Sequence, residues 1–189
     1  MKVTLFGAAF DPPHLGHQMI ATSLLEQNLA ELVCLVPVKD HAFGKKMLND
    51  GHRLAMLKTM VQPGVEIETY ELNQPTPSRT FETLRALRSK YLEHEFSFII
   101  GADNLARFHE WQDYQTMLQE FPFFVYPRKG FELKPLYSGM QVLKDVAEVD
   151  VSSTQVKEWI RRGRPIENLV SPAVNQYIQQ HNLYSSKKK

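Results

Sequence analysis

The sequence predicts an α/β fold, a doubly wound and mostly parallel sheet with helices on both faces and a C-terminal helical segment. Short apolar runs alternate along the chain with stretches of helical periodicity, the order that right-handed strand–helix–strand units produce. Two of the runs, 32–38 and 96–100, are apolar almost throughout, as parallel strands covered on both faces are. Turns of small or polar residues follow several runs, at the strand ends where open α/β sheets bind ligands.

Composition narrows the class of protein. With 189 residues the chain can bury one sizeable core, and we expect one domain over 1–184 and a disordered basic tail over 185–189. A formal net charge of +1 gives no reason to expect long-range attraction to nucleic acid or a membrane. The single cysteine, Cys34, excludes an internal disulfide and a cysteine cluster for zinc. The sequence has no signal-peptide pattern and no membrane-spanning apolar stretch, which predicts a cytoplasmic protein.

The first element is an apolar run over 2–6 that ends at Gly7, before the turn AAFDPP and a helix that starts at HLGH. His14 and His17 are three residues apart, so on a helix they share a face. Amides of a turn and of a helix start lack internal acceptors, while imidazoles donate N–H groups and carry charge when protonated. An isolated pair of histidines is more often a surface or capping feature. The small residues around this pair favour a phosphate site instead.

The second apolar run, 32–38, is predicted to be a strand that ends in a loop. Asn49 or Asp50 can cap the helix that follows. Arg53 lies on this helix and is interpreted as a structural residue, with a role in a site as the alternative. Lysines at the end of a strand are usually solvated, but this position favours a ligand contact for at least one of them. The lysines of the loop are Lys39, Lys45 and Lys46.

The middle of the chain continues the alternation. A strand over 65–70 and a proline-rich turn precede a helix that opens near Ser78 and runs to about Tyr91, where hydroxyls can cap the helix or contact a ligand. The run 96–100 is the clearest strand and leads into the turn GADN. A carboxylate there, Asp103, suits the two hydroxyls of a ribose, and a helix cap is the simpler alternative.

The last third of the chain is less regular. We expect a fifth strand over 121–126, a loop or short helix over 131–145, and a final strand over 146–151. The string SST then starts a helix, where hydroxyls and amides form either a second anion site or an ordinary cap. A packing helix closes the chain.

Several of these segments resemble one protein family. GAAFDPPHLGH is similar to the GGxFDPxHxGH signature of the HxGH nucleotidyltransferases, most closely the nicotinate and nicotinamide mononucleotide adenylyltransferases. The strings PVKDHAFGKK, PSRTFETL, IIGADNLARFHEWQDY and VDVSSTQVKEWIRRG resemble further segments of that family in the same order. The resemblance implies a Rossmann-like fold and transfer of AMP from ATP to the mononucleotide. It also implies Mg²⁺ carried on the ATP phosphates, and it leaves a homo-oligomer open.

The resemblance assigns roles residue by residue. The implied catalytic residues are His14, His17 and Lys45, with Lys46 as the fallback for the lysine. The implied ATP-binding residues are Gly7, Ala8, Ala9, Phe10, Gly101, Asp103, Ser152, Ser153, Thr154 and Lys157. The implied mononucleotide-binding residues are Thr80, Thr83 and Trp111. No residue is implied to ligate a metal.

Four positions depart from the family pattern. Ala8 replaces a glycine, Ala9 replaces a threonine or serine, Arg79 replaces a tyrosine, and Lys157 replaces an arginine. Lysine keeps the charge but loses the two-pronged grip of a guanidinium, so the contact is weaker or Arg161 assists it. Two alternatives therefore stay open: another HxGH transferase, acting on pantetheine phosphate or with a cytidylyl donor, and a non-catalytic nucleotide-binding protein. The choice between nicotinate and nicotinamide also stays open.

Overall fold

The computed structural model describes residues 1–40, 44, 46–146 and 150–185. Within these residues the centre of the molecule is a six-stranded sheet in which every neighbouring pair is parallel, in the order β3-β2-β1-β4-β5-β6. This confirms the predicted doubly wound sheet. The strands are β1 (Lys2–Ala8), β2 (Leu32–Pro37), β3 (Val65–Ile67), β4 (Glu95–Gly101), β5 (Phe123–Tyr126) and β6 (Met140–Val142).

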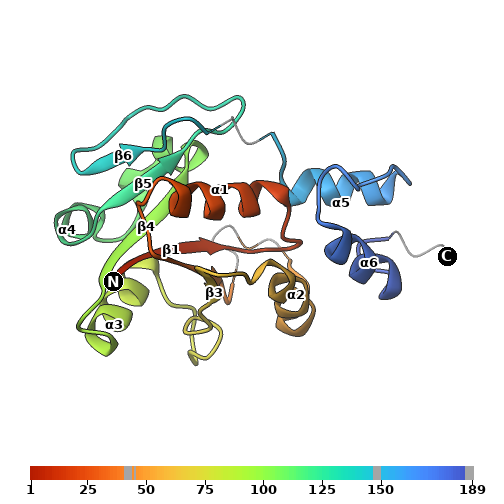
Figure 1. Cartoon of the computed structure of the whole chain (residues 1–189), viewed down its shortest axis with the longest axis horizontal. Helices are drawn as coiled ribbons and strands as arrows, with labels where there is room; N and C mark the ends of the chain where they lie inside the picture. The colour runs from red at the N-terminus through yellow and green to blue at the C-terminus, as the bar shows by residue number, and fades with distance from the viewer. Residues whose placement is uncertain (41–43, 45, 147–149, 186–189) are drawn as a thin grey trace.

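Helices cover both faces of the sheet, and a further pair of helices lies beyond one end of it. The α-helices are α1 (Leu15–Glu26), α2 (Asp50–Leu57), α3 (Thr80–Lys90), α4 (Tyr114–Glu120), α5 (Ser153–Arg161) and α6 (Pro172–Gln180). Two 3₁₀ segments, η1 (Lys58–Met60) and η2 (Ala102–Glu110), complete the described elements. In Figure 1, α5 and α6 lie beyond the arrowhead of β1, as the predicted C-terminal helical segment. None of the described helices has the length and apolar content needed to cross a bilayer.

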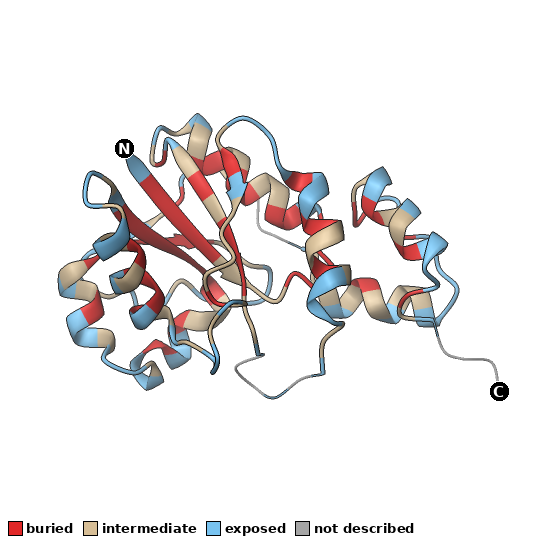
Figure 2. Ribbon diagram, turned by 90° about the horizontal axis from the view of Figure 1, so that it is seen from below, coloured by how far each residue is buried: buried red, intermediate tan, exposed pale blue. Residues whose placement is uncertain are grey.

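Alternation along the strands builds a core on each face of the sheet, because successive side chains of a strand point to opposite sides. Leu5 and Phe98 pack with α3, η2 and α4, whereas Phe6 and Ile99 pack with α1 and α2. A third cluster joins α2, α5, α6 and the segment after α6, and Met56 is its contribution from α2. Figure 2 shows the strands coloured as buried between the helices.

The final strand was predicted at the wrong place. Residues 140–142 form β6, inside the stretch expected to be a loop or short helix, while the described residues Val146, Asp150 and Val151 lie outside strands. This three-residue strand is specified by its pairing with β5, which the amide of Leu143 extends by donating to the Val125 carbonyl at 2.9 Å. Such pairing depends on a distant neighbour more than on local pattern.

Several predicted boundaries also shift. The strand expected over 65–70 ends at Ile67, and β5 begins at Phe123. Asn49 caps α2 as predicted, accepting from the His52 amide at 3.1 Å. The N-cap of α3 is Arg79 and not Ser78. Of the predicted tail, only Ser185 belongs to the described residues.

Candidate active site

The predicted phosphate-binding residues meet where the strand order of the sheet reverses. β1 and β4 are neighbours, but the chain continues from β1 toward β2 and from β4 toward β5. Their connections therefore leave in opposite directions, which opens a crevice at the carboxyl ends of the strands. The turn after β1, the turn after β4 and the residues after β5 surround this point.

The turn after β1 is shaped by close packing. A Cβ on Gly7 would lie 2.9 Å from Cζ of Phe98, so glycine lets β1 pass against that ring. Phe10 has a left-handed backbone, with φ 45°, and a fully buried ring that packs 4.8 Å from His17. A ligand at this turn would therefore meet the backbone of Phe10 and not its ring. Ala8 and Ala9 are half-buried.

The Arg53 side chain is hydrogen-bonded to this turn. Its guanidinium is fully buried, and it donates to the carbonyls of Ala9 and Val38, each at 2.8 Å, and to Asp50 at 2.6 Å. These bonds tie the turn after β1 to the end of β2 and to the start of α2. The prediction of a structural arginine is confirmed.

The two histidines form a stacked pair at the start of α1. The ring centroids of His14 and His17 are 3.7 Å apart at 25°, and both side chains are buried. Nδ1 of His17 accepts the backbone N–H of His14 at 3.1 Å. A neutral His17 ring is therefore the tautomer that carries its proton on Nε2, and Nε2–H can donate to a ligand.

Backbone amides contribute less here than the sequence suggested. The N–H of Leu15 donates to the carbonyl of Leu169 at 2.9 Å, and the N–H groups of His17 and Gln18 donate to the carbonyl of His14. Most of the first turn of α1 is thus already bonded. The imidazoles are the principal donors left at this helix start.

The histidines are neutral at neutral pH. Burial, helped by the nearby Arg128 guanidinium, lowers the pKa of His14 from 6.5 to about 3. The pKa of His17 is also well below its usual range, because of burial first, then His14, then Arg128. The imidazoles therefore act as neutral donors, and the positive charge closest to them in the pKa balance is the guanidinium of Arg128.

Sequence reasoning missed Arg128, which follows β5. Its Nη1 atom lies 2.8 Å from Oδ2 of Asp103, with the two side chains 23% and 27% exposed. A Cβ on Gly101 would come within 2.3 Å of Oδ1 of Asp103, so glycine lets this carboxylate fold over the end of β4. Asp103 is not a helix cap, because η2 begins after Gly101 as its N-cap. The signal that could have revealed Arg128 is a cation directly after a strand, at the edge that holds HLGH.

The start of α5 docks on the turn after β1. Ser153 Oγ donates to the carbonyl of Pro12 at 2.8 Å, while Ser152 Oγ caps the helix by accepting from the Gln155 amide at 3.2 Å. Thr154 is exposed. The two predicted anion sites are thus brought together, although two of the three hydroxyls are engaged within the protein.

Lys157 pairs with a carboxylate that sequence reasoning did not consider. Its Nζ lies 2.5 Å from Oδ2 of Asp11, and the hydroxyl of Tyr184 donates to Oδ1 of Asp11 at 2.7 Å. Asp11 is 2% exposed and Lys157 21%. An acidic residue inside the apolar turn AAFDPP was the available signal for a buried ion pair.

The predicted mononucleotide residues fall in two places. Thr80 opens α3 and is half-buried, whereas Thr83 is buried and donates to Glu71 at 2.9 Å. Trp111 is half-buried, with its ring 6.4 Å from Phe98, the ring that packs against Gly7. Among the described residues, no hydrogen bond or ring contact links either threonine to the histidines.

The loop after β2 is only partly described. Lys45 lies outside the described residues, and Lys46 is exposed. Lys39 donates to the carbonyl of Gln74, which ties the end of β2 to the segment before α3.

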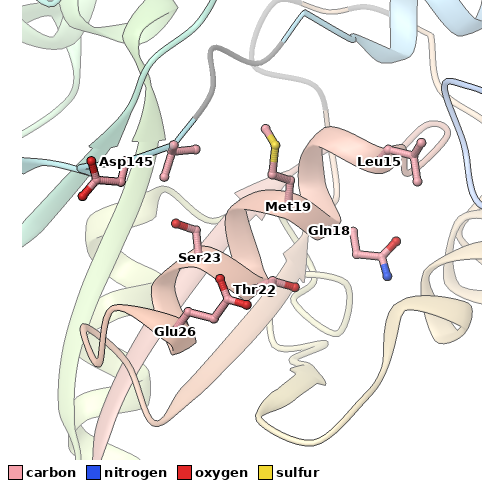
Figure 3. Close-up of a pocket in the computed structure, with 8 residues that line it drawn as sticks. Leu15, Gln18, Met19, Thr22, Ser23, Glu26 and Asp145 are labelled. Atoms are coloured by element: carbon pink, nitrogen blue, oxygen red, sulfur yellow. The ribbon is translucent and has the colours of Figure 1, made fainter.

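A groove of about 440 Å³ runs along α1, as Figure 3 shows, and is separate from this crevice. Its two charged residues, Glu26 and Asp145, are acidic and would repel phosphate. Neither histidine lines it. The lining residues are Leu15, Gln18, Met19, Thr22, Ser23, Glu26, Asp145 and Val146.

Comparisons with known proteins agree with this geometry. Residues 5–159 match the cytidylyltransferase-like family. The chain is 31% identical to nicotinate-nucleotide adenylyltransferase of Bacillus subtilis (strain 168), over 98% of this chain and 99% of the relative. It is 35% identical to a probable nicotinate-nucleotide adenylyltransferase of Pseudoalteromonas atlantica, over 95% of this chain and 93% of the relative.

A solved structure supports the fold. The Plasmodium falciparum nicotinic acid mononucleotide adenylyltransferase complexed with NaAD superposes with a TM-score of 0.80 at 17% identity, and the match covers 97% of each chain. The sequence matches span nearly the full length of both partners and the family match spans most of this chain. The chain therefore belongs to the nicotinate-nucleotide adenylyltransferases, within the cytidylyltransferase-like family.

Proposed function

We propose that this protein joins ATP and nicotinate mononucleotide to give deamido-NAD and pyrophosphate, a step of NAD biosynthesis. The observation that carries the proposal is the stacked, neutral His14–His17 pair beside Arg128 at the crevice between β1 and β4. The relatives named above favour nicotinate over nicotinamide as the base of the acceptor. The phosphate of the mononucleotide attacks the α-phosphorus of ATP in line, and the bond from that phosphorus to the bridging oxygen of pyrophosphate breaks.

The chemistry needs positioning and charge stabilisation more than proton transfer. The attacking phosphate is already ionised at neutral pH, so no general base is required. Donors held in place before the reaction stabilise charge that develops on the transferring phosphate. Nε2–H of His17 fits this role, because its Nδ1 is occupied by the amide of His14. A phosphate beside the imidazoles would be balanced by the guanidinium of Arg128.

The remaining residues frame the two substrates. The backbone of the turn from Gly7 to Phe10 and the start of α5 would line the phosphates of ATP, with Lys157 and the loop lysine Lys45 adding charge. Gly101 and Asp103 would hold ribose, and Trp111 would offer an aromatic face to the pyridine ring. Since the hydroxyl of Thr83 donates to Glu71, a contact from the start of α3 is better supplied by Thr80.

Mg²⁺ would be carried on the triphosphate. Asp11 and Asp103, the acidic side chains at this edge, are each paired with a cation, so they fit a dedicated metal cage poorly. Bound to the phosphate oxygens, the ion neutralises their charge. No cluster of three or more histidine, cysteine, aspartate or glutamate side chains suited to a metal occurs among the described residues. We further propose that residues 1–184 work as one nucleotidyltransferase domain.

The test is product formation from ATP and a panel of acceptors. Purified protein with Mg²⁺ is incubated with nicotinate mononucleotide, nicotinamide mononucleotide or pantetheine phosphate, and pyrophosphate and dinucleotide are measured. We expect the highest kcat/KM with nicotinate mononucleotide. A preference for pantetheine phosphate would identify another transferase. ATP binding without product from any acceptor would identify a non-catalytic nucleotide-binding protein.

A further inference from the structure

We propose that Tyr184, acting through Asp11, positions the ammonium of Lys157 at the phosphate-binding edge, which makes the C-terminal end of the described chain a working part of the site. The inference rests on the proposed function, since it takes Lys157 as a contact for ATP phosphate. It assigns Tyr184 and Asp11 as positioning residues that need not touch the substrates.

The two oxygens of the Asp11 carboxylate have different partners. Oδ1 accepts the hydroxyl of Tyr184 at 2.7 Å, and Oδ2 meets the ammonium of Lys157 at 2.5 Å. Because each oxygen has its own partner, the carboxylate cannot rotate without losing one of them. The Tyr184 hydroxyl thus fixes the direction from which Asp11 holds Lys157.

The backbone around Tyr184 is fixed by packing and hydrogen bonding. Leu183 is buried against the cluster of α5 and α6, and its amide donates to the carbonyl of Ile178 at 3.0 Å. Tyr184 has φ 61°, a left-handed conformation that a bulky side chain adopts only where its surroundings require it. Burial, and then the bond to Asp11, raise the pKa of the Tyr184 hydroxyl far above its usual range, so it remains a donor.

The Asp11 carboxylate can orient the ammonium of Lys157. A lysine offers three donors on a flexible stem, without the fixed fork of arginine. Asp11 can engage one N–H and leave the others for phosphate oxygens. Ser153 binds α5 to Pro12 of the same turn, so the helix that carries Lys157 is docked where the phosphates would lie. The Asp11–Tyr184 pair would therefore supply the geometric definition that lysine lacks.

The experiment is a double-mutant cycle on Tyr184 and Lys157. Tyr184→Phe removes the hydroxyl and keeps the ring, whose centroid is 5.5 Å from the Lys157 ammonium. We expect the KM for ATP to rise about 3- to 10-fold, the scale of one hydrogen bond, with the KM for the mononucleotide changed less than about twofold. In a Lys157→Met background, adding Tyr184→Phe should change the KM for ATP no further, because no ammonium remains to be positioned.

The matched control is Tyr177→Phe. Tyr177 lies on α6, and its hydroxyl bonds with Nδ1 of His52 at 3.0 Å, away from Asp11. This control should leave the KM for ATP unchanged. If Lys157→Met does not fold, Lys157→Gln serves as the uncharged background.

Two results would overturn the inference. One is an unchanged KM for ATP in Tyr184→Phe; the other is an equal effect of Tyr184→Phe with and without the Lys157 ammonium, which would reduce Tyr184 to a packing role. If the wild-type protein binds ATP but makes no dinucleotide, the proposed function fails, and the same cycle is read from ATP dissociation constants by calorimetry. Absence of ATP binding would overturn both proposals.

Discussion

Replacing His17 by asparagine removes one donor from the crevice while keeping the acceptor that the backbone uses. The Oδ1 atom of asparagine can take the place of Nδ1 and accept the His14 amide, which lies 3.1 Å from that nitrogen. What disappears is the Nε2–H group. Loss of one preorganised donor to a developing charge lowers kcat by about 10²–10³, or about 3–4 kcal/mol of transition-state stabilisation.

The structure also sets the expected cost in stability. The His17 ring packs against His14 and Phe10, at centroid distances of 3.7 and 4.8 Å, so an alanine would leave a cavity in the core. Asparagine keeps more of the volume and should reduce the free energy of unfolding by about 1–2 kcal/mol. For a chain of this size that corresponds to a Tm lowered by about 2–8 °C.

The assay separates these effects. Turnover is measured at saturating ATP and mononucleotide, well below the Tm of the variant, with the folded fraction checked by circular dichroism. His17→Gln is the matched variant, since its amide reaches the position of Nε2 and can donate there; it should retain more activity than His17→Asn. A folded His17→Asn protein with kcat within about threefold of wild type would refute the role of Nε2–H.

Three further predictions concern packing and charge around the site. Gly101→Ala places a Cβ 2.3 Å from Oδ1 of Asp103, so it should weaken nucleotide binding measured by calorimetry and destabilise the fold by about 1–3 kcal/mol; unchanged affinity would contradict the assigned packing. Arg53→Met leaves two backbone carbonyls without their donor, so the free energy of unfolding measured in urea should fall by about 3 kcal/mol. A decrease below about 1 kcal/mol would contradict this role. Burial raises the pKa of Glu71 from 4.5 to about 7, so the fold retains a proton that the unfolded chain releases. This stability is fully present below about pH 4.5 and is lost as pH rises through about 7, by about 3 kcal/mol. The buried, neutral His14 and His17 act in the opposite direction between pH 5 and pH 8, equally in both proteins, so Glu71→Gln should gain about 2–3 kcal/mol relative to wild type when urea unfolding at pH 8 is compared with pH 5, and an equal pH dependence in the two proteins would contradict the raised pKa of Glu71.

Much of the fold was predictable from local pattern. The run 96–100 is continuous and apolar because β4 is covered on both faces, and β1 continues to Ala8, one residue past Gly7, where the glycine lets the strand lie against the Phe98 ring. β6 escaped prediction because its three residues are ordered by pairing with β5, a partner that the local sequence does not reveal. The position of Arg128 at the same edge likewise follows from the register of β5 beside β4.

For the site, the sequence by itself determined which chemical groups lie at the carboxyl ends of the strands. His14, His17 and Asp103 follow strands or open helices, and those positions are set by short-range periodicity and turn residues. Only the tertiary structure decided which groups are paired and which are charged. The imidazoles are neutral because they are buried near Arg128, and Lys157 is oriented by a carboxylate 146 residues away. Ionisation and pairing depend on burial and on neighbours distant in the chain, and no local pattern contains either.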